Sequence, residues 1–349
     1  MKIAITYDHL DTRIEDRPDP ELTRGSLLCD LRVCGVCTTD VLAWYVRSKA
    51  PVVLGHEAIG TVRAVGEGVF GFKAGDRVFY HHHAPCGKCT FCLRKQFTFC
   101  PTWKKNSVTP GGLAQTVRVE PESVRMDTLL IPPAMTDEEA VFIEPLACSL
   151  RAARRAGAAP GKTAVQIGLG VMGMVNCFAL MAYGVKKIIA VDLTPIRIQW
   201  GKELGIPHVL DGNAPDENKR ILEFTDGGAD IVIVGPHTIE SMQTAFEVVG
   251  KGGTVLLYTP ADPKETLPVN PSDLYFRDVT LTSSYSCDPD DTREALHLIK
   301  EKLLPTERLI THRFPFSQTA EAFRLLAAGG AVLKVLVYGD EVKDVNSKW

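Results

Sequence analysis

A glycine-rich segment, AVQIGLGVMG, constrains the fold of this chain more than any other feature. Its glycines follow an apolar run and open an amphipathic stretch in the order G-x-G-x-x-G, and the next apolar run ends at Asp192. Such a turn between a strand and a helix lets the backbone approach a pyrophosphate at the helix N-terminus. The pattern predicts a dinucleotide site formed by Gly168, Gly170, Val171, Met172, Gly173, Asp192 and Arg197.

Asp192, the acidic residue after the apolar run 188–191, indicates which dinucleotide is bound. A carboxylate there can accept hydrogen bonds from both ribose hydroxyls of NAD and would repel the 2′-phosphate of NADP. Arg197 weakens this preference, because it could face the adenosine side. We predict NAD over NADP.

The pattern around the glycines predicts an α/β fold with two domains. Apolar runs at 164–167, 188–191, 231–234 and 254–258 alternate with amphipathic stretches at 171–183, 195–204 and 239–249, as in a doubly wound parallel sheet of the Rossmann type. The first 147 residues are instead rich in short strand-like runs broken by Gly and Pro. We place a β-rich domain at 1–147, to which 288–349 returns, and the nucleotide domain at 148–287.

Composition excludes several classes of protein. The chain has 349 residues, 45% of them hydrophobic and 23% charged, with a formal net charge of -3. No basic excess suggests nucleic acid, and no apolar stretch approaches the roughly 18 residues of a membrane span. With no signal peptide and ten cysteines, a cytoplasmic location is expected, where thiols bind metals, react or pack in cores.

Four of the cysteines form a dense group with the spacing C-x2-C-x2-C-x7-C. A disulfide net is disfavoured by the reducing compartment, and the last spacing differs from that of an iron–sulfur run. Four thiolates brought together by tight turns suit a closed, structural zinc site. The predicted ligands are Cys86, Cys89, Cys92 and Cys100.

A second group of metal-ligating residue types is spread over three short segments. CGVCTTD contains Cys37, VLGHE contains His56 and Glu57, and FIEPLAC contains Glu144. One soft, one borderline and hard ligands suit zinc, and fewer permanent ligands are typical of a catalytic site. Taken singly, each residue could instead be a core thiol, a hydrogen-bonded histidine or a charge at a helix start.

These motifs together resemble the zinc-dependent medium-chain dehydrogenases. The similarity rests on CGVCTTD, VLGHEAIGTV, GDRV, the four-cysteine segment, EPLAC, the glycine pattern and LKVLV, so it spans nearly the whole chain. Glu57 and Glu144, in place of a third cysteine, favour the polyol (sorbitol-type) and threonine dehydrogenase branch. The resemblance implies a GroES-like β-domain built from both ends of the chain, with a Rossmann domain inserted.

The resemblance also implies roles for individual residues. Cys37, His56 and Glu57 would hold a catalytic zinc, and Glu144 would ligate it or hold its water. Thr39 would pass on the substrate proton, and Asp40 would support His56. His83, within the run His81–His83, would lie near the substrate, although its residue type alone favours a structural role, because histidine is often just a partly buried hydrogen-bonding residue.

The implied reaction moves a hydride from a secondary alcohol (a polyol, sugar alcohol or diol) to NAD and gives a ketone. Dimers or tetramers are common among such enzymes. Three alternatives stay open: a threonine-type amino alcohol dehydrogenase, a zinc-free NADPH reductase and a non-catalytic zinc-binding module. The segment between Cys37 and His56 is shorter than in polyol dehydrogenases, so the substrate cannot be transferred from them.

Overall fold

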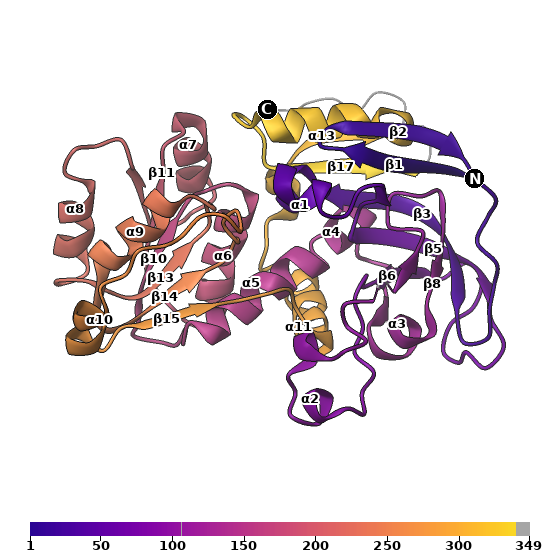
Figure 1. Ribbon diagram of the computed structural model, residues 1–349, viewed down its shortest axis with the longest axis horizontal. Helices are drawn as coiled ribbons and strands as arrows, with labels where there is room; N and C mark the ends of the chain where they lie inside the picture. Colours follow the sequence, from indigo (N-terminus) through magenta and orange to yellow (C-terminus); the bar gives the residue numbers. More distant parts are fainter. Residues whose placement is uncertain (106, 340–349) are drawn as a thin grey trace. The chain divides into compact units, whose positions relative to one another are not determined.

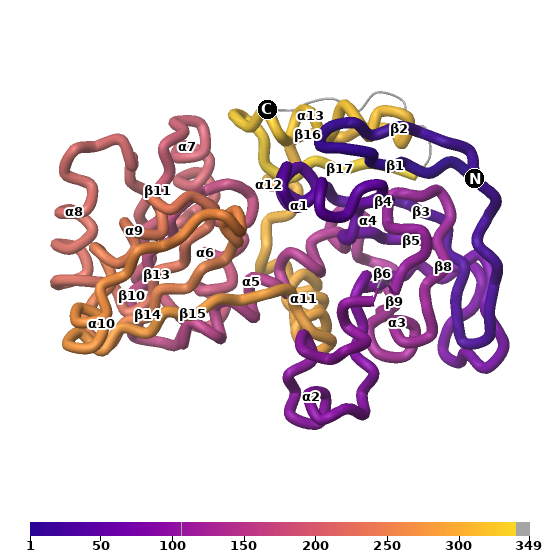
Figure 2. Tube along the Cα trace, viewed as in Figure 1, coloured from indigo at the N-terminus to yellow at the C-terminus, as the bar shows by residue number. Residues whose placement is uncertain are grey.

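The computed structural model describes residues 1–105 and 107–339, and it divides into two compact units (Figure 1). One unit is Met1–Ala147 together with the chain from Cys287 onward, and the other is Cys148–Ser286. Both ends of the chain therefore belong to the first unit, as the indigo and yellow segments of Figure 2 show. The sequence placed the return to the first domain one residue later, at 288.

The second unit contains a six-stranded parallel sheet in the order β12-β11-β10-β13-β14-β15. This is the doubly wound order 3-2-1-4-5-6, so the α/β prediction is confirmed. The strands are β10 (Thr163–Ile167), β11 (Lys187–Asp192), β12 (His208–Asp211), β13 (Ala229–Val234), β14 (Val249–Leu257) and β15 (Thr280–Ser283). The helices are α6 (Val171–Ala182), α7 (Pro195–Glu203), α8 (Glu217–Phe224), α9 (Ile239–Val248) and α10 (Pro271–Arg277).

Burial explains why the inner strands of this sheet consist of almost uninterrupted apolar residues. Helices cover both faces of a parallel sheet, so consecutive side chains are all excluded from water. In β11 every residue after Lys187 is buried, and in β13 only Asp230 among its six residues is not. The glycine turn follows β10, at the point where the strand order reverses.

The first unit is built on a sheet in the order β16-β17-β3-β5-β6-β9, on which β8 also pairs with β3. A smaller sheet has the order β2-β1-β4, and β7 pairs with β8. The strands are β1 (Lys2–Asp8), β2 (Asp11–Asp16), β3 (Leu27–Val36), β4 (Val52–Val53), β5 (Glu57–Val65), β6 (Arg77–Tyr80), β7 (Val108–Thr109), β8 (Thr116–Val119), β9 (Thr128–Leu130), β16 (Ile310–Pro315) and β17 (Lys334–Tyr338). Strand β17 lies antiparallel to β3, with Val335 opposite Val36, and so joins the two ends of the chain.

Short helices connect these strands. They are η1 (Thr38–Val41), α1 (Ala43–Arg47), α2 (Thr90–Leu93), η2 (Phe97–Phe99), α3 (Pro121–Met126), α4 (Asp137–Ala140), α11 (Pro289–Lys300), α12 (Thr306–Leu309), η3 (Phe316–Gln318) and α13 (Thr319–Ala328). Helix α5 (Ile143–Arg155) begins in the first unit and ends in the second. Across 1–105 and 107–339, none of the helices has the length and apolarity that a membrane crossing requires.

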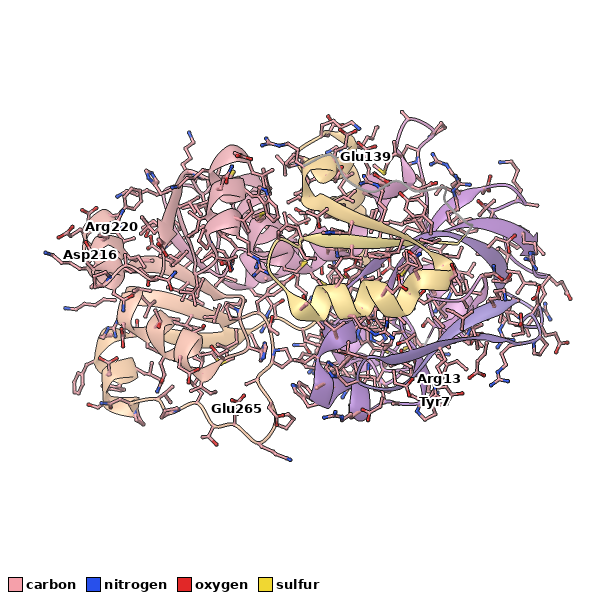
Figure 3. The ribbon with its side chains drawn as sticks, turned by 90° about the horizontal axis from the view of Figure 1, so that it is seen from above. Tyr7, Arg13, Glu139, Asp216, Arg220 and Glu265 are labelled. Carbon is pink, nitrogen blue, oxygen red and sulfur yellow. The ribbon has the colours of Figure 1, made fainter. Side chains whose placement is uncertain are left out.

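Exposed polar residues cover the outer face of the β1–β2 hairpin. The guanidinium of Arg13 lies over the ring of Tyr7, 4.8 Å from its centroid, as the two labelled side chains in Figure 3 show. Arg13 also bonds both carboxylate oxygens of Asp11. Such surface contacts add little stability, but they keep the hairpin polar on its exposed side.

A partly buried ion pair fixes the C-terminal strands to α4. Arg313 on β16 donates from two nitrogens to the two oxygens of Glu138, at 2.7 Å each, and the hydroxyl of Tyr338 on β17 also donates to Glu138. These hydrogen bonds, first that of Arg313, hold the pKa of Glu138 below its usual value. Their contribution is complete at neutral pH and is lost as the pH falls through the lowered pKa.

We predict that Glu138→Gln lowers the free energy of unfolding by about 1–2 kcal/mol at pH 7, since a two-pronged charged hydrogen bond is replaced by a neutral contact. As the pH falls from the ordinary glutamate pKa of about 4.3 through the lowered pKa of native Glu138, the difference from wild type should shrink, because the wild-type carboxyl becomes protonated. Urea unfolding at pH 7 and through this range measures this. Asp16→Asn, which removes an exposed partner of Lys2, is the control and should leave stability unchanged; a pH-independent Glu138→Gln effect would contradict the ion pair.

Candidate metal centres and nucleotide site

The four predicted cysteines lie together in one lobe of the first unit. The sulfur ligand atoms of Cys86, Cys89, Cys92 and Cys100 are all within 4.8 Å of one another. The Sγ atoms of Cys89 and Cys92 are 3.6 Å apart, and those of Cys86 and Cys92 are 3.9 Å apart. Sulfurs of a tetrahedral zinc site are separated by about 3.8 Å, so the lobe fits a structural zinc.

Backbone amides around the lobe favour thiolates. The N–H of Cys86 donates to Cys100 Sγ at 3.3 Å, and that of Cys89 donates to Cys86 Sγ at 3.4 Å. Burial opposes ionisation, but the amides of Cys86 and Thr102 lower the pKa of Cys100 to about 6. Cys92 is held by burial at a raised pKa of about 12, so a metal would have to displace its proton.

A second set brings together Cys37, His56 and Glu57, whose ligand atoms also lie within 4.8 Å of one another. Cys37 follows the end of β3, His56 immediately precedes β5, and Glu57 is the first residue of β5. Because β3 and β5 pair in antiparallel register, with Gly35 opposite Glu57, residues twenty positions apart in the chain meet at one edge. A thiol, an imidazole and a carboxylate are donors that zinc accepts.

Asp40 on η1 orients two members of this second set. Its Oδ2 accepts a hydrogen bond of 3.1 Å from the backbone N–H of Cys37, and its Oδ1 lies 3.5 Å from Nδ1 of His56. A carboxylate beside one ring nitrogen leaves the other available for a metal. Although burial works against it, the charges of Asp40 and Cys37 raise the pKa of His56 well above its usual value, so the surroundings attract a cation.

Glu57 is held by a buried lysine that the sequence did not single out. Nζ of Lys334, the first residue of β17, lies 2.8 and 2.6 Å from the two carboxylate oxygens, and both side chains are only 1% exposed. Burial disfavours the ammonium, but the carboxylate of Glu57 raises the pKa of Lys334 above its usual value. Glu57 is therefore neutralised in part by Lys334, and it remains a predicted rather than an observed metal ligand.

In the run His81–His83, the histidine that lies beside the second set is His82, whereas the sequence predicted His83. The ring of His82 is 4.9 Å from that of His56, centroid to centroid, whereas His83 packs 5.5 Å from Trp103 of the cysteine lobe. Burial lowers the pKa of His82 well below its usual value and that of His83 to about 3, so both rings are neutral at physiological pH. The catalytic role expected of His83 stays a prediction, and His82 has the better position for it.

Glu144 and Thr39 complete the residues expected at the catalytic metal. Burial raises the pKa of Glu57, and the charge of the nearby Glu144 raises it further. The carboxylate of Glu144 lies within 4.8 Å of the ligand atoms of His81 and Cys287, and it is not part of the cluster of Cys37, His56 and Glu57. Thr39 lies on η1 and is partly exposed. Within the described residues its hydroxyl makes no hydrogen bond, so it is free to bind a substrate.

The glycine turn has the geometry expected of a pyrophosphate-binding loop. Gly168 has φ +84°, and a Cβ there would lie 2.9 Å from Cδ of Pro236. A Cβ on Gly173 would lie 1.9 Å from the carbonyl oxygen of Gly168, so only glycine lets α6 start this close to β10. Gly170 caps α6 and faces open space.

The remaining nucleotide residues lie around this turn. Asp192 ends β11, and its carboxylate accepts hydrogen bonds from the backbone N–H groups of Leu169 and Thr194, at 2.6 and 2.8 Å. Asp192 therefore fixes the loop of the predicted nucleotide site. Val171 and Met172 form the first turn of α6, and Nε of Arg197 on α7 is buried without a hydrogen-bond partner in the part of the chain that the structure describes.

Comparison with known families matches both units. The alcohol dehydrogenase GroES-like domain matches residues 23–128, and the zinc-binding dehydrogenase domain matches residues 170–301. A sorbitol dehydrogenase of Bacillus subtilis is 28% identical over 349 residues, with 97% of each chain covered. D-xylulose reductase A of Aspergillus oryzae is 29% identical, with 95% of this chain and 94% of that protein covered.

Solved structures share the fold over nearly the whole chain. An alcohol dehydrogenase from Thermus sp. ATN1 has a TM-score of 0.87 at 24% identity, covering 97% of this chain and 99% of that one. The 2R,3R-butanediol dehydrogenase from Bacillus subtilis has a TM-score of 0.84, with the same identity and coverage. At this level of identity the likeness shows the fold alone, which is the predicted GroES-like unit with an inserted Rossmann unit.

Gly35 provides a test of how Glu57 is packed. A Cβ at this position would lie 1.9 Å from Oε2 of Glu57 and 2.8 Å from Cγ1 of Val141. We predict that Gly35→Ala lowers the free energy of unfolding by about 2–4 kcal/mol, because the buried carboxylate must move off Lys334. Thermal unfolding of Gly35→Ala beside Gly170→Ala, whose Cβ would meet open space at a φ of -63°, measures this; equal losses in the two variants would contradict the packing.

Proposed function

The chain belongs to the zinc-dependent medium-chain dehydrogenase/reductase family, in its polyol dehydrogenase branch, and on this premise we propose that it oxidises a secondary alcohol of the polyol or diol class with NAD. The observation that carries the proposal is the set Cys37, His56 and Glu57, supported by Asp40. Its mixed donors fit a catalytic zinc, whereas the four-cysteine lobe fits a closed structural one. The product is the corresponding ketone.

The chain's own residues prepare the alcohol for oxidation. When bound, zinc would supply a Lewis acid that lowers the pKa of the alcohol hydroxyl. Cys37 and His56 would hold the ion, and Asp40 keeps the His56 ring oriented through Nδ1. The free hydroxyl of Thr39, two residues after Cys37, would take up the substrate proton and pass it toward water.

His82 adds a neutral imidazole beside this set. Burial, followed by the charges of His83 and His56, keeps its pKa low, so it can exchange a hydrogen bond with a substrate hydroxyl without bringing in a positive charge. Its Nδ1 is buried and has no partner within the described residues. A hydroxyl-rich substrate would satisfy that nitrogen, which supports a polyol or diol over a simple alkanol.

The second unit would hold the hydride acceptor. The turn of Gly168, Gly170 and Gly173 can accommodate a pyrophosphate against the start of α6, with Val171 and Met172 at its edge. Asp192 uses one lone pair of each oxygen on backbone amides and retains others for the ribose hydroxyls. Its charge favours NAD over NADP.

Two of the alternative functions can be compared with these observations. A zinc-free reductase would have no need for a set of Cys37, His56 and Glu57 with its own orienting carboxylate. A threonine-type enzyme needs a cation and an anion site for the amino acid groups. Among the described residues the buried cation beside this set, Lys334, is already engaged by Glu57, which favours the uncharged polyol.

We also propose a cytoplasmic homo-oligomer, either a dimer or a tetramer. Strand β15 lies at the end of the parallel sheet, and aromatic side chains near it are exposed: Tyr275 by 79%, Phe276 by 80% and Tyr285 by 55%. An open strand edge flanked by apolar side chains can pair with a second copy. This arrangement supports association through the second unit.

The proposed reaction predicts NADH formation, followed at 340 nm, on one class from a panel of sugar alcohols, vicinal diols, simple secondary alcohols and threonine. Cys37→Ala should lower kcat/KM by at least about 100-fold, since even residues that only support a metal ligand are worth about 10–100-fold. Cys29→Ala, which truncates a fully buried thiol of β3, is the matched control and should retain activity.

Several outcomes would contradict the proposal. Full turnover by Cys37→Ala would exclude this set from the reaction. A higher kcat/KM with NADP than with NAD would overturn the role given to Asp192. Activity on threonine alone would favour the amino alcohol alternative.

A further inference from the structure

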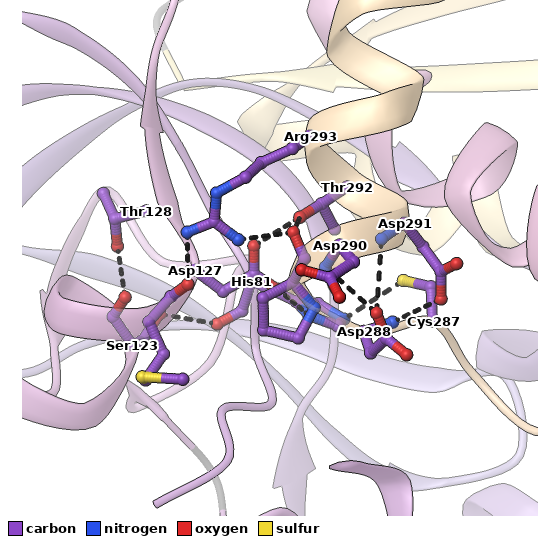
Figure 4. Close-up of polar contacts among 12 residues, drawn as sticks. His81, Ser123, Asp127, Thr128, Cys287, Asp288, Asp290, Asp291, Thr292 and Arg293 are labelled. Atoms are coloured by element: carbon purple, nitrogen blue, oxygen red, sulfur yellow. Dashed lines mark hydrogen bonds and ion pairs between the residues drawn. The ribbon is translucent and has the colours of Figure 1, made fainter. Parts of the chain in front are cut away.

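His81 directs its hydrogen-bonding groups to neighbouring parts of the first unit (Figure 4). Nδ1 of its ring lies 2.8 Å from Oδ2 of Asp127, and Nε2 lies 3.7 Å from Sγ of Cys287. Its backbone N–H donates to the carbonyl of Asp127 at 3.0 Å, and its carbonyl accepts from the hydroxyl of Ser123 at 2.9 Å. The side chain of His81 is 0% exposed and both ring nitrogens have protein partners, so the ring is not available to a substrate.

His82, the next residue, lies beside the second set with one ring nitrogen unpartnered among the described residues. That nitrogen is Nδ1, which is buried, and the ring centroid is 4.9 Å from that of His56. The backbone of His82 is held, because its carbonyl accepts from the N–H of Ser107 at 2.9 Å. A ring nitrogen in this situation can bind a ligand, provided that the ring is kept in place.

The position of Asp127 beside His81 is set by the strand register. Strand β9 pairs with β6 so that Thr128 lies opposite Tyr80. The residues that adjoin this pair, Asp127 and His81, therefore meet. Both side chains are 0% exposed, and a buried carboxylate whose hydrogen-bond donors are fixed holds the imidazole in one orientation.

Helix α11 provides a second hold on Asp127. The hydroxyl of Thr292, in the first turn of this helix, donates to Oδ1 of Asp127 (Figure 4). The helix starts in a capping box whose N-cap residue is Asp288, so the place of Thr292 is itself fixed. Arg293 of the same helix donates to the carbonyl of Met126 at 2.8 Å, next to Asp127 in the chain. The carboxylate that orients His81 is thus attached to a helix as well as to the sheet.

The backbone transmits this fixed position from His81 to His82. His81 directly follows β6, and the peptide unit that joins it to His82 is planar and rigid. The rings of the two residues are 5.0 Å apart, at an interplanar angle of 77°. If His81 turned, the backbone from which the His82 ring projects would turn with it, and a displacement of about 1 Å at a reaction site can cost about 100-fold in rate.

We propose that His81 is a positioning residue, which is held by Asp127 and keeps the ring of His82 beside His56, where His82 can bond a hydroxyl of the substrate. This inference rests on the proposed function, because the contact between His82 and the substrate belongs to it. His81 itself contacts neither the substrate nor the metal.

A double-mutant cycle on kcat/KM tests the proposal. His82→Ala should lower kcat/KM roughly 3- to 10-fold, the value of one hydrogen bond, and His81→Leu should lower it by a similar factor. The double variant should be no slower than His82→Ala, because His81 acts only through His82. Losses that multiply in the double variant would overturn the proposal, since they would show an independent structural effect. An unchanged kcat/KM in either single variant would also overturn it.

Further variants separate the hydrogen bond from the bulk of the ring. His81→Asn keeps an N–H near the place of Nδ1 for Asp127, so it should retain the wild-type kcat/KM. Thr292→Val removes only the hydroxyl that donates to Asp127, and it tests the same network if His81→Leu does not fold. We expect a smaller loss from Thr292→Val, which should vanish in the His82→Ala background. Thr225→Val, which removes a buried hydroxyl bonded to a backbone carbonyl in the second unit, is the matched control and should leave kcat/KM unchanged. A fully active Thr292→Val combined with an impaired His81→Asn would contradict the network.

Ring geometry gives a readout that does not depend on turnover. In crystal structures of wild type and of His81→Asn, the ring of His82 should keep its separation of 4.9 Å from that of His56, and in His81→Leu it should move away. The same separation in His81→Leu would overturn the positioning role, whether or not the protein oxidises an alcohol. A wild-type protein that forms no NADH would instead contradict the proposed function.

Discussion

The buried ion pair between Lys334 and Glu57 is the interaction on which the arrangement of the first unit depends. Both side chains are 1% exposed, so neither charge is compensated by water. Removing one partner of such a pair costs about 3–5 kcal/mol, because the other charge is left buried alone. The pair joins β17, from the end of the chain, to the strand β5 that begins beside His56, and Gly35 of β3 leaves the space in which the carboxylate lies.

The metal set depends on this pair. His56 precedes Glu57 in the chain, and Cys37 lies two residues beyond Gly35, so the same strand pairing that positions the carboxylate also brings the thiol and the imidazole together. Asp40 then orients His56. The set thus combines donors that zinc accepts with fixed neighbours that hold them, which is what a catalytic metal requires of its protein.

The parallel sheet and the four-cysteine lobe were predictable because their motif residues lie close together in the sequence. The glycine pattern followed by Asp192 predicted a doubly wound sheet. At Gly168 and Gly173 a side chain would collide with neighbouring atoms, so the fold requires glycine at both positions. The cysteine spacing predicted the lobe because the ligands lie within fifteen residues. Lys334 and His82 were missed as site residues, because their importance arises from contacts between distant segments. The LKVLV segment contained a lysine in an apolar strand, and that buried charge was the one signal that could have pointed to a partner for Glu57.

NADH binding and NADH formation should be followed in the same protein, before and after removal of its labile metal. Cys37 and His56 would hold that metal, whereas the turn after β10 would hold the nucleotide. We therefore expect turnover to be lost with the metal and to return with zinc, while the Kd for NADH stays unchanged. Turnover that persists without the metal, or NADH binding that disappears with it, would contradict this assignment.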